Sequence, residues 1–530
     1  MIENVCILAA GFGKRQEFSK FSSKALVPFG KGSALDYLLE IIPKNKSIFI
    51  AVNYYSQDII NYLSITHPKK NIKFIQVESI DKINSGPAMS LLSCRPFLDK
   101  PFLLLACDSL PKKNLDFKSK TNWMGVYKKQ NPRQYLNLEI KNNEVIQPIK
   151  EGESSKIHDS TYSFSGTAAI FDTNIFFSAL SESVFKMHSG DVLNGFLALR
   201  KKRLQVKLID WYELGNTVDY KKSNIEYDKK YKFIDHSIPK TNAYIYFFNK
   251  KVIKFFENDF LSNNFFERRK FLSNLGPSEL ELKGRFVAYN YAKGKLLSYE
   301  SDPNKIVEVL NILSLQLWNK KTVISNESIN LGERFYLHKT LDRIELSVQK
   351  FNLSKKQIFV NGNFLPDLET QLNKVNWEDL FKYTPSYFHG DPQPENIIVG
   401  RKKITFIDWR TDFAGNLEYG DCYYDLGKIY HALVISGRAV RDNNFNVIFS
   451  NDDVNIKLFR YRNLIYMLNL LELWCEQNGY NIKKVRTIAA LILLNISPLH
   501  SEEYGVFLFY MGRLLLNNSD KNWSKVLDKS

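Results

Sequence analysis

Short apolar runs that alternate with amphipathic segments between Val5 and Ile209 place the strongest limit on the fold. Five runs have the length and composition of strands: Val5–Ala10, Ile48–Asn53, Ile72–Glu78, Pro101–Ala106 and Leu204–Ile209. Two segments have the apolar spacing of helices, namely Ala34–Ile42 and Gln57–Ser64. This alternation predicts an α/β domain in the first part of the chain.

A glycine-rich loop, Gly11-Phe-Gly-Lys-Arg15, follows the first run, and Lys24 begins the next apolar segment. A strand that leads into such a loop lets backbone N–H groups approach phosphate oxygens, and nearby cations neutralise the phosphate charge. Arg15 and Lys24 are the candidate cations. Asp108 stands after the run that ends at Ala106, where open α/β sheets bind ligands, and its carboxylate suits Mg²⁺.

Together these residues resemble the signature of the sugar-1-phosphate and choline-phosphate nucleotidyltransferases, a strand with LAAG-x-G-x-R and a following Lys-x-Leu. The resemblance implies a Rossmann-like domain with a mixed sheet, in which Arg15 and Lys24 support the attacked α-phosphate of an NTP. It implies these nucleotide-binding residues: Leu8, Ala10, Gly11, Gly13 and Gly86.

The same resemblance implies two metal ligands and an acceptor region. Asp108 is the first ligand, and Glu213 stands where the family has its second aspartate. Glu151 and Gly166 are expected to contact the phosphorylated acceptor. Pro87 replaces a threonine of the family's base-contacting segment, so the base stays open, with CTP or UTP expected.

The segment Tyr387–Trp409, YFHGDPQPENIIVGRKKITFIDW, carries a second set of polar residues. Asn396 follows Asp391 by five positions, and a strand-like hairpin ends in Asp408. Phosphoryl transfer needs a carboxylate that orients the substrate hydroxyl, and an Asn and a second carboxylate that hold Mg²⁺ against the phosphates. Asp391, Asn396 and Asp408 fit these three roles. The alternative is that Asp391 and Asn396 only cap turns.

This segment resembles the catalytic loop and metal-binding aspartate of the aminoglycoside phosphotransferase and choline kinase superfamily. The resemblance implies a two-lobed α+β kinase-like domain that uses ATP. It also implies that Lys254 reaches the α- and β-phosphates and pairs with Glu267 on the next helix. Four later segments have helical apolar spacing: Asp425–Val434, Val454–Cys475, Lys483–Asn495 and Gly505–Leu516.

These patterns divide the chain into a nucleotidyltransferase domain at 1–221, a Lys-, Asp- and Asn-rich linker at 222–242 and a kinase-like domain at 243–530. The 530 residues include 44% hydrophobic residues and five cysteines without a CxxC pair, so we expect neither zinc nor disulfides. The formal charge of +17 is scattered and forms no stripe with interleaved aromatics, which disfavours a nucleic-acid partner.

The first residues indicate a buried strand and not a signal peptide, and the later apolar segments are shorter than the ~20 residues of a membrane span. We therefore expect a cytoplasmic protein that binds nucleotides and small molecules and makes no stable membrane insertion; its oligomeric state stays open.

The sequence predicts a bifunctional enzyme. One domain would phosphorylate a sugar, polyol or amino alcohol with ATP and Mg²⁺. The other would transfer a nucleotidyl group from a second NTP to that phosphate and release pyrophosphate, making an activated precursor for surface polysaccharide or lipid decoration. Three alternatives stay open: a choline kinase joined to a choline-phosphate cytidylyltransferase, an enzyme in which only the kinase half is active, and a non-catalytic nucleotide-binding scaffold.

Overall fold

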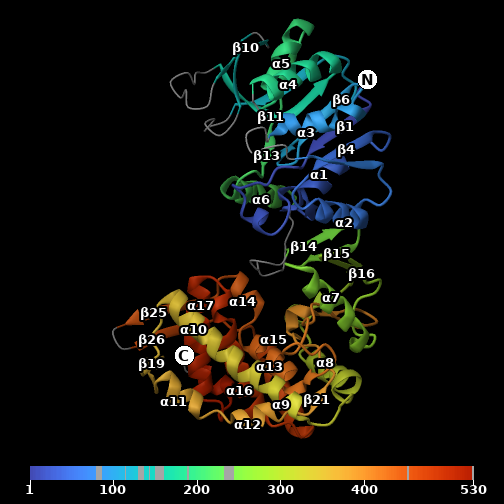
Figure 1. Ribbon diagram of the computed structural model, residues 1–530. Coiled ribbons are helices and arrows are strands. Elements are labelled where there is room, and N and C mark those ends of the chain that lie inside the picture. The colour runs from blue at the N-terminus through green and yellow to red at the C-terminus, as the bar shows by residue number, and fades with distance from the viewer. Residues whose placement is uncertain are drawn as a thin grey trace. The chain divides into compact units, whose positions relative to one another are not determined.

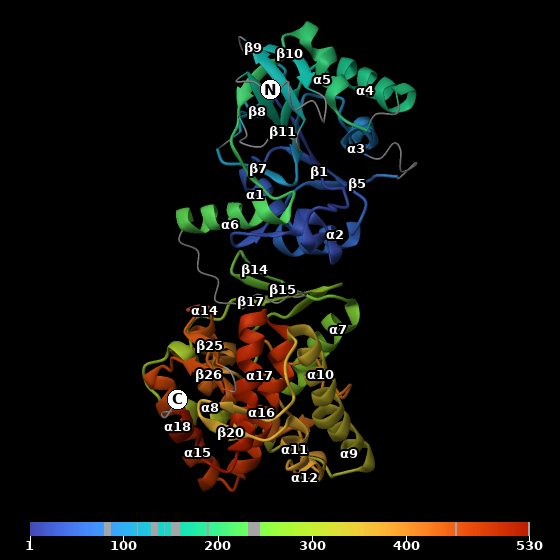
Figure 2. The same ribbon diagram turned by 90° about the vertical axis from the view of Figure 1, so that its left-hand side faces the viewer.

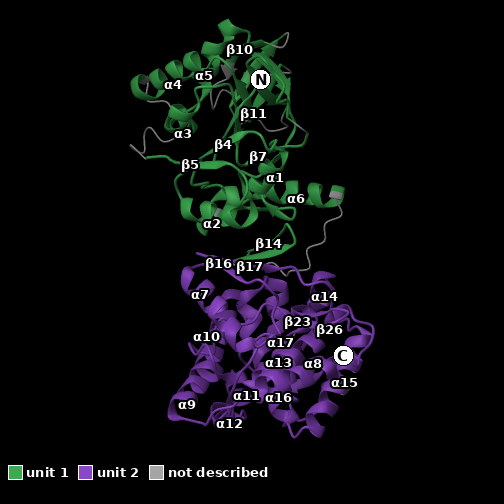
Figure 3. Ribbon diagram, turned by 90° about the vertical axis from the view of Figure 1, so that its right-hand side faces the viewer, with its two compact units in different colours: residues 1–236, 244–254 green, residues 237–243, 255–530 purple. Residues whose placement is uncertain are grey.

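The computed structural model describes residues 1–78, 86–113, 115–128, 136–141, 144–149, 160–187, 190–231, 244–450 and 453–527. The chain forms two compact units (Figure 3). The first comprises residues 1–236 and 244–254, and the second comprises residues 237–243 and 255–530.

The first unit is built on a mixed sheet with the order β10-β9-β11-β6-β1-β4-β5, and β8 joins β11 to β12 (Figure 1). Its described strands are β1 (Asn4–Leu8), β2 (Pro28–Phe29), β3 (Gly32–Ser33), β4 (Ser47–Val52), β5 (Ile72–Gln76), β6 (Phe102–Ala106), β7 (Ser109–Pro111), β8 (Trp123–Tyr127), β9 (Asn137–Lys141), β10 (Glu144–Ile149), β11 (Thr161–Ile170), β12 (Gln205–Leu208), β13 (Trp211–Glu213), β14 (Tyr244–Phe248) and β15 (Lys251–Phe255). Its helices are α1 (Ala34–Ile41), α2 (Ser56–Thr66), α3 (Pro87–Cys94), α4 (Thr173–Met187), α5 (Leu193–Leu199) and α6 (Thr217–Tyr231).

The centre of this sheet is parallel, because β1 pairs with both β4 and β6 in parallel and β4 pairs with β5 in parallel. The central strands β1, β4 and β6 are largely buried, as the interior strands of such a sheet require, whereas the edge strands β5 and β12 are only partly buried. Helix α3 packs on β1, β4 and β5. A capping box between Ser33 and Asp36 begins α1. The strands predicted from the five apolar runs and the mixed α/β sheet are therefore confirmed.

The predicted linker is helical at its start, because α6 includes residues 222–231. Apolar periodicity did not predict this helix, because its packed face consists of tyrosines and a serine instead of aliphatic residues. Tyr220 donates a hydrogen bond to the Pro28 carbonyl, Ser223 donates one to the Glu213 carbonyl, and the Tyr227 ring packs on Phe29. These three residues lie on one helical face.

The strands predicted at 243–248 and 251–256 form the hairpin of β14 and β15. Its two turn residues, Asn249 and Lys250, both have positive φ, 48° and 63°, as a tight hairpin turn requires. The sequence assigned the hairpin to the second domain, whereas residues 244–254 group with the first unit.

The second unit is mainly helical. Its described helices are α7 (Asp259–Arg268), α8 (Lys305–Leu313), α9 (Asn326–Glu333), α10 (Lys339–Phe351), α11 (Leu368–Asn373), α12 (Trp377–Phe381), α13 (Cys422–Val434), α14 (Gly437–Arg441), α15 (Arg462–Gln477), α16 (Ile482–Ile496), α17 (Glu502–Asn517) and α18 (Trp523–Leu527). Helix α16 packs against α10, α13 and α17, and Figure 2 shows α16 and α17 side by side. Their apolar faces form the core of the unit.

Short strands complete the second unit: β16 (Glu281–Lys283), β17 (Phe286–Asn290), β18 (Lys295–Leu296), β19 (Ile358–Val360), β20 (Asn363–Leu365), β21 (Pro385–Ser386), β22 (Ile397–Val399), β23 (Ile404–Phe406), β24 (Gly420–Asp421), β25 (Phe445–Ser450) and β26 (Asp453–Leu458). The predicted helix Val454–Cys475 is wrong at its start, because β26 occupies that stretch and α15 begins at Arg462. Val454 and Ile456 are buried and alternate with more exposed neighbours, which is the period of a strand.

None of the helices in the described part of the chain is long and apolar enough to cross a membrane.

Candidate active sites

The pairing of β1 with β6 brings the glycine-rich loop and Asp108 to the same edge of the first unit's sheet. Leu8 lies opposite Ala106 in the parallel register. Each strand ends there, so the loop that contains Ala10 and Gly11 and the turn that contains Asp108 leave the sheet side by side. This edge is the position at which parallel α/β sheets bind ligands.

Lys24 and Asp108 form an ion pair at this edge. Lys24 begins a short 3₁₀ turn, η2 (Lys24–Leu26), and the Ser23 side chain caps it by accepting the Ala25 N–H. The Lys24 Nζ atom lies 2.6 Å from Asp108 Oδ2. Burial alone would lower the pKa of Lys24, but the Asp108 carboxylate outweighs it and raises that pKa. Burial likewise opposes ionisation of Asp108, but the charge of Lys24 prevails, so the pKa of Asp108 is lowered.

Glu213 lies beside Asp108 because β13 pairs with β7, and Glu213 is opposite Ser109. Its carboxylate accepts hydrogen bonds from the Trp211 indole at 2.9 Å and the Gly215 N–H at 3.0 Å. A Cβ atom added to Gly215 would lie 2.8 Å from Glu213 Oε1 and 3.1 Å from Asp108 Oδ2. Both carboxylates therefore converge on Gly215.

Two converging carboxylates fit Mg²⁺, which takes oxygen ligands and retains phosphate oxygens and water in its coordination shell. Within the described ranges, no group of three or more His, Cys, Asp or Glu side chains gathers into a metal site. A Mg²⁺ ion held by Asp108 and Glu213 would thus need further ligands from a bound phosphate or from water.

Three of the four predicted glycines, Gly13, Gly86 and Gly166, have structural reasons to be glycine, whereas a Cβ atom on Gly11 would make only ordinary contact with Lys24 at 3.6 Å. Gly13 and Gly166 have φ values of 73° and 71°, in the left-handed region. A Cβ atom on Gly166 would lie 2.7 Å from the Cβ atom of Ala106, so β11 approaches the end of β6 closely. Gly86 precedes α3, and a Cβ atom there would lie 2.2 Å from the Gly190 carbonyl oxygen. The other predicted acceptor residue, Glu151, falls outside the described residues.

Arg15 is exposed in the glycine-rich loop. Its backbone carbonyl accepts a hydrogen bond from the Thr217 N–H at 3.2 Å, which joins the loop to the start of α6. The positive charge of Arg15 contributes to lowering the pKa of Asp108. Arg15 therefore acts electrostatically on the same carboxylate as Lys24.

In the second unit, Asp391 lies at the centre of a group of polar contacts. The Asn396 amide donates to the Asp391 carbonyl at 2.9 Å and to its Oδ2 atom at 3.3 Å. The Lys428 ammonium on α13 lies 2.8 Å from Asp391 Oδ1. Burial would lower the pKa of Lys428, but Asp391 outweighs it and raises that pKa. The lysine thus stays charged beside the aspartate.

Asp408 follows β23 and is held close to the same loop by backbone hydrogen bonds on both sides. The Ile407 N–H donates to the Asn396 carbonyl at 2.9 Å, and the Arg410 N–H donates to the His389 carbonyl at 3.1 Å. Asp408 itself has φ of 60°, a conformation that costs energy for a residue other than glycine. The structure therefore brings Asp391, Asn396 and Asp408 into one neighbourhood.

Asp425, at the start of α13, fixes the backbone that precedes Asp391. Its carboxylate accepts the His389 N–H at 2.8 Å, the Gly390 N–H at 2.6 Å and the Trp318 indole N–H at 3.0 Å. Burial raises the pKa of Asp425 to about 6, against the effect of these hydrogen bonds. Gly390 has φ of 86°, so a glycine is needed where the backbone turns onto this carboxylate.

Arg268 on α7 supports the same loop from the other side. Its fully buried guanidinium donates to the Phe388 carbonyl at 2.7 Å, to the Leu417 carbonyl at 2.8 Å and also to the carbonyls of His389 and Arg410. Burial lowers its pKa to about 9. One side chain thus holds four backbone oxygens from three parts of the loop region.

We expect Arg268→Met to lower the free energy of unfolding by about 3 kcal/mol or more, because a fully buried guanidinium and its hydrogen bonds to four backbone carbonyls are lost. Chemical denaturation of the purified proteins measures this change. Arg269→Met is the matched control: the neighbouring guanidinium is partly exposed and donates to the Ser273 carbonyl in its own turn. Equal destabilisation by the two substitutions would contradict this assignment.

Lys254 and Glu267 belong to different units, so their pairing stays a prediction. Lys254 is buried in β15. The Glu267 carboxylate is exposed and lies 2.7 Å from the Lys270 ammonium, three residues later on the same helical segment.

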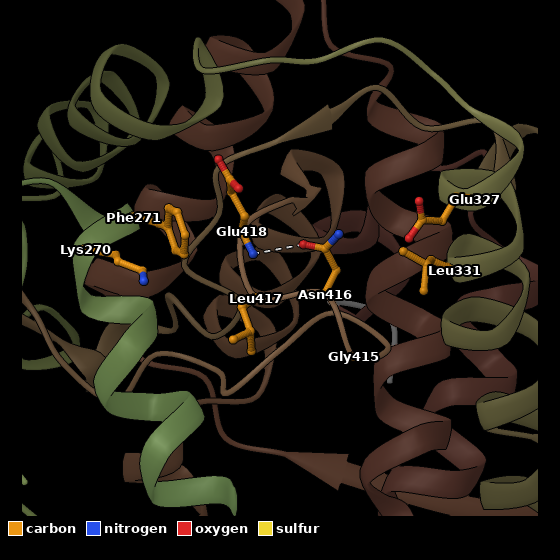
Figure 4. A pocket seen from close by; sticks show the side chains of 8 residues that line it. All are labelled: Lys270, Phe271, Glu327, Leu331, Gly415, Asn416, Leu417 and Glu418. Atoms are coloured by element: carbon orange, nitrogen blue, oxygen red, sulfur yellow. Dashed lines mark hydrogen bonds between the residues drawn. The ribbon is translucent and has the colours of Figure 1, made fainter.

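A pocket of about 410 Å³ opens elsewhere in the second unit (Figure 4). It is lined by Lys270, Phe271, Glu327, Leu331, Gly415, Asn416, Leu417 and Glu418. Asn416 accepts a hydrogen bond from the Glu418 N–H, which orders the loop on one side of the pocket. None of the residues predicted from the sequence lines it.

Three supporting residues were not assigned roles from the sequence: Arg268, Asp425 and Lys428. Asp425 and Lys428 are three positions apart on α13, yet they act on opposite ends of the segment from His389 to Asp391. Both residues are more than thirty positions from Asp391, so no motif spacing linked them to it. One available signal was the presence of charged residues inside helical segments with apolar faces, which is costly unless the charges are paired.

No family model matches the chain, and no curated protein matches it. Solved structures similar to its N-terminal part are nucleotidyltransferases. One is a UDP-glucose pyrophosphorylase complexed with UDP-glucose, with 15% identity and a TM-score of 0.37 over 43% of this chain and 100% of that one. A CTP:phosphocholine cytidylyltransferase from Streptococcus pneumoniae has 17% identity and a TM-score of 0.36 over 43% and 100% of the two chains. An inositol-1-phosphate CTP transferase from T. maritima has 17% identity and a TM-score of 0.34 over 44% and 98%. At such identities and TM-scores, these likenesses carry no conclusion about activity.

Proposed function

We propose that the chain is a bifunctional enzyme that phosphorylates a small hydroxylated molecule with ATP and then joins that phosphate to a nucleotidyl group from a second NTP. One observation carries the proposal. In each unit, segments far apart in sequence meet around one carboxylate that is paired with a lysine, Asp108 with Lys24 at 2.6 Å and Asp391 with Lys428 at 2.8 Å.

In the second unit, Asp391 orients the acceptor hydroxyl and accepts its proton as the acceptor oxygen bonds to the γ-phosphorus of ATP. The bond from that phosphorus to the ADP oxygen breaks, and ADP leaves. Lys428 and the Asn396 amide hold the Asp391 side chain in place for this step. Asn396 and Asp408 would hold Mg²⁺, which neutralises phosphate charge when bound.

In the first unit, an oxygen of the new phosphomonoester attacks the α-phosphorus of the second NTP, and pyrophosphate leaves. Lys24 and Arg15 supply positive charge at the edge of the sheet where the glycine-rich loop ends. Such preorganised charge stabilises the transition state more than the ground state. Asp108 and Glu213 are the side chains that would hold Mg²⁺.

The test is a coupled assay of the full chain. It contains Mg²⁺, ATP and each of CTP, UTP, GTP and dTTP, with a panel of sugars, polyols and amino alcohols, and it measures ADP and pyrophosphate separately. The proposal predicts both products for the same acceptor, with pyrophosphate dependent on one NTP. If ADP forms but no NTP gives pyrophosphate, only the proposed kinase activity is supported. The absence of both products across the panel would contradict the proposal.

Asp425 gives the phosphoryl transfer an expected pH dependence. Its carboxylate holds the N–H groups of His389 and Gly390 more strongly when it is ionised, and burial raises its pKa to about 6. Burial lowers the pKa of His389 to about 3, so the imidazole stays neutral over the same range. We expect the rate of ADP formation to fall as the pH drops through about 6.

Protonation of Asp425 does not itself unfold the protein. Because its folded-state pKa lies above that of an unfolded aspartate, the folded state binds more protons, and this group adds stability as the pH falls towards the unfolded pKa. Rate and melting temperature measured over the same pH range separate the two effects. A melting temperature that falls in step with the rate would attribute the loss to unfolding and contradict the role of Asp425.

A further inference from the structure

Cationic side chains from three segments of the second unit gather beside Asp391. Lys339 and Arg343 lie four residues apart on α10 and so share one face of that helix. Tyr424 and Lys428 share a face of α13 in the same way. Arg410 comes from the loop two residues after Asp408.

Aromatic rings bring these segments together. The Lys339 Nζ atom lies 4.0 Å from the centre of the Phe335 ring and 5.8 Å from the centre of the Tyr424 ring. The Arg410 guanidinium carbon lies 5.0 Å from the centre of the same Phe335 ring. Phe335 and Tyr424 contact each other edge to face at 4.8 Å. Two cations therefore share one ring next to the helix that carries Lys428.

This group has more positive than negative charge. Among the residues that the structure describes, no carboxylate lies within ion-pair distance of Lys339, Arg343 or Arg410. The Arg410 Nε atom donates to the Asp412 backbone carbonyl at 2.7 Å, whereas the Asp412 carboxylate accepts bonds from Thr411 and Gly415.

The neighbouring cations make it harder for Lys339 to stay protonated. Burial, followed by the charges of Arg410, Lys428 and Arg343, lowers the pKa of Lys339 well below its usual value. Lys339, Arg343 and Arg410 are half-buried, and bringing like charges together where water is partly excluded costs stability unless an anion joins them. A protein retains such a cluster where a ligand supplies the missing negative charge.

We propose that the acceptor of the phosphoryl transfer carries a phosphate or carboxylate group, which Lys339, Arg343 and Arg410 bind next to Asp391. This inference rests on the proposed function and narrows it. It selects sugar acids, hydroxy acids and phosphorylated polyols, and it disfavours choline and other cationic acceptors, because a quaternary amine would be repelled by these three side chains.

The first experiment compares matched acceptors on the full chain. Each set contains a neutral polyol, its carboxylate and its phosphate, for example glycerol, glycerate and glycerol phosphate, and the corresponding forms of longer sugars. ADP formation is measured with Mg²⁺ and ATP at low and high salt. We expect kcat/KM for the anionic member to exceed that of its neutral counterpart by about ten- to a hundredfold, the effect of one or two charge-assisted hydrogen bonds. Equal or better use of the neutral members would overturn the inference while leaving the kinase intact.

The second experiment uses Lys339→Met and Arg343→Gln, with Arg334→Gln as the control. Arg334 is an exposed arginine in the turn η10 (Arg334–His338) directly before α10. We expect both cluster variants to raise KM for the anionic acceptor about tenfold, with KM for ATP unchanged, and the control to leave both constants unchanged. A raised KM for ATP instead would assign the cluster to the nucleotide and overturn the inference.

Stability distinguishes this role from a structural one. Lys339→Met removes a half-buried charge that has no carboxylate within ion-pair distance among the described residues, so we expect its melting temperature to equal or exceed that of the wild type. A clear loss of stability would mean that Lys339 serves the fold, contrary to the inference.

Inorganic phosphate provides a readout that requires no acceptor. Relative to sodium chloride of equal ionic strength, we expect it to raise the melting temperature of the wild type and of Arg334→Gln more than that of either cluster variant. The same rise in all four proteins would overturn the anion site. Loss of ADP formation with every acceptor, together with the expected phosphate effect, would contradict the kinase proposal and leave the anion site standing.

Discussion

Asp391→Asn is expected to reduce ADP formation by about a thousandfold while the protein stays folded. An asparagine has the shape of the aspartate but cannot accept the proton of the acceptor hydroxyl, and a positioned base typically contributes 10²- to 10⁴-fold. The substitution also removes the charge that Lys428 faces at 2.8 Å. The loss should therefore appear mainly in kcat, because the acceptor and ATP still bind.

The measurement is steady-state ADP formation with the acceptor identified in the coupled assay. Asp379→Asn is the matched control, because this exposed aspartate lies in the same unit and pairs with Lys484 at 3.3 Å. It should leave the rate unchanged. Pyrophosphate release from an already phosphorylated acceptor should be preserved in Asp391→Asn. Residual ADP formation within a few-fold of the wild type would exclude Asp391 as the catalytic base.

The residues at the edge of the first unit's sheet could be anticipated because parallel strands impose simple geometry. Once Val5–Ala10 and Pro101–Ala106 were identified as neighbouring buried strands, their C-terminal ends had to meet at one edge. The register of Leu8 with Ala106 and the contact of Lys24 with Asp108 follow from that arrangement. Glu213 could be placed there only by the spacing of a known signature, because β13 belongs to a separate two-stranded sheet.

The surroundings of Asp391 could not be anticipated in the same way. Asn396 and Asp408 are near it in sequence, within one loop and hairpin. Lys428, in contrast, reaches Asp391 because α13 packs under the loop, and helix packing depends on side-chain shape along the whole helix.

The cluster of cationic side chains beside Asp391 also arises from the packing of elements that are distant in sequence. Lys339 and Arg410 share the ring of Phe335 only because α10 and the loop after Asp408 meet there. No pattern in the sequence indicated this group, because its members, from Lys339 to Lys428, are spread over about ninety positions, three elements and two residue types. An α-helical i, i+4 pair such as Lys339 and Arg343 is also the ordinary pattern of a solvated helix face.

Two errors in secondary structure have a common cause. In β26 and α6 the packed positions are few and lie beside polar residues, so the period of burial is weak in the sequence. In β26 the buried residues Val454 and Ile456 alternate with more exposed ones, and the apolar helix α15 follows closely. The alternating pattern of the short strand therefore merged in the sequence with the helical pattern of α15. In α6 the buried face consists of Tyr220, Ser223 and Tyr227, residues that apolar periodicity does not count.

Asp108→Asn is expected to abolish the second reaction and spare the first. The substitution removes one of the two carboxylates that converge on Gly215 and the charge that faces Lys24 at 2.6 Å. Loss of a charged metal ligand removes several kcal/mol of transition-state stabilisation, so pyrophosphate release should fall about a hundredfold or more. Asp210→Asn is the control, because this partly exposed aspartate pairs with Lys112 in the same unit. It should leave pyrophosphate release unchanged.

Mixing Asp108→Asn with Asp391→Asn tests whether the two reactions share an intermediate. Asp108→Asn should make ADP and accumulate the phosphorylated acceptor, whereas Asp391→Asn should make neither ADP nor pyrophosphate from the unphosphorylated acceptor. Together in one solution they should restore pyrophosphate release, because the product of one protein is the substrate of the other. Restoration also requires that the intermediate leaves the first protein.

If each variant alone retains both activities, the carboxylates are not catalytic. If Asp108→Asn accumulates a phosphorylated acceptor that Asp391→Asn cannot use, then the two reactions do not share an intermediate and the sequential scheme is wrong.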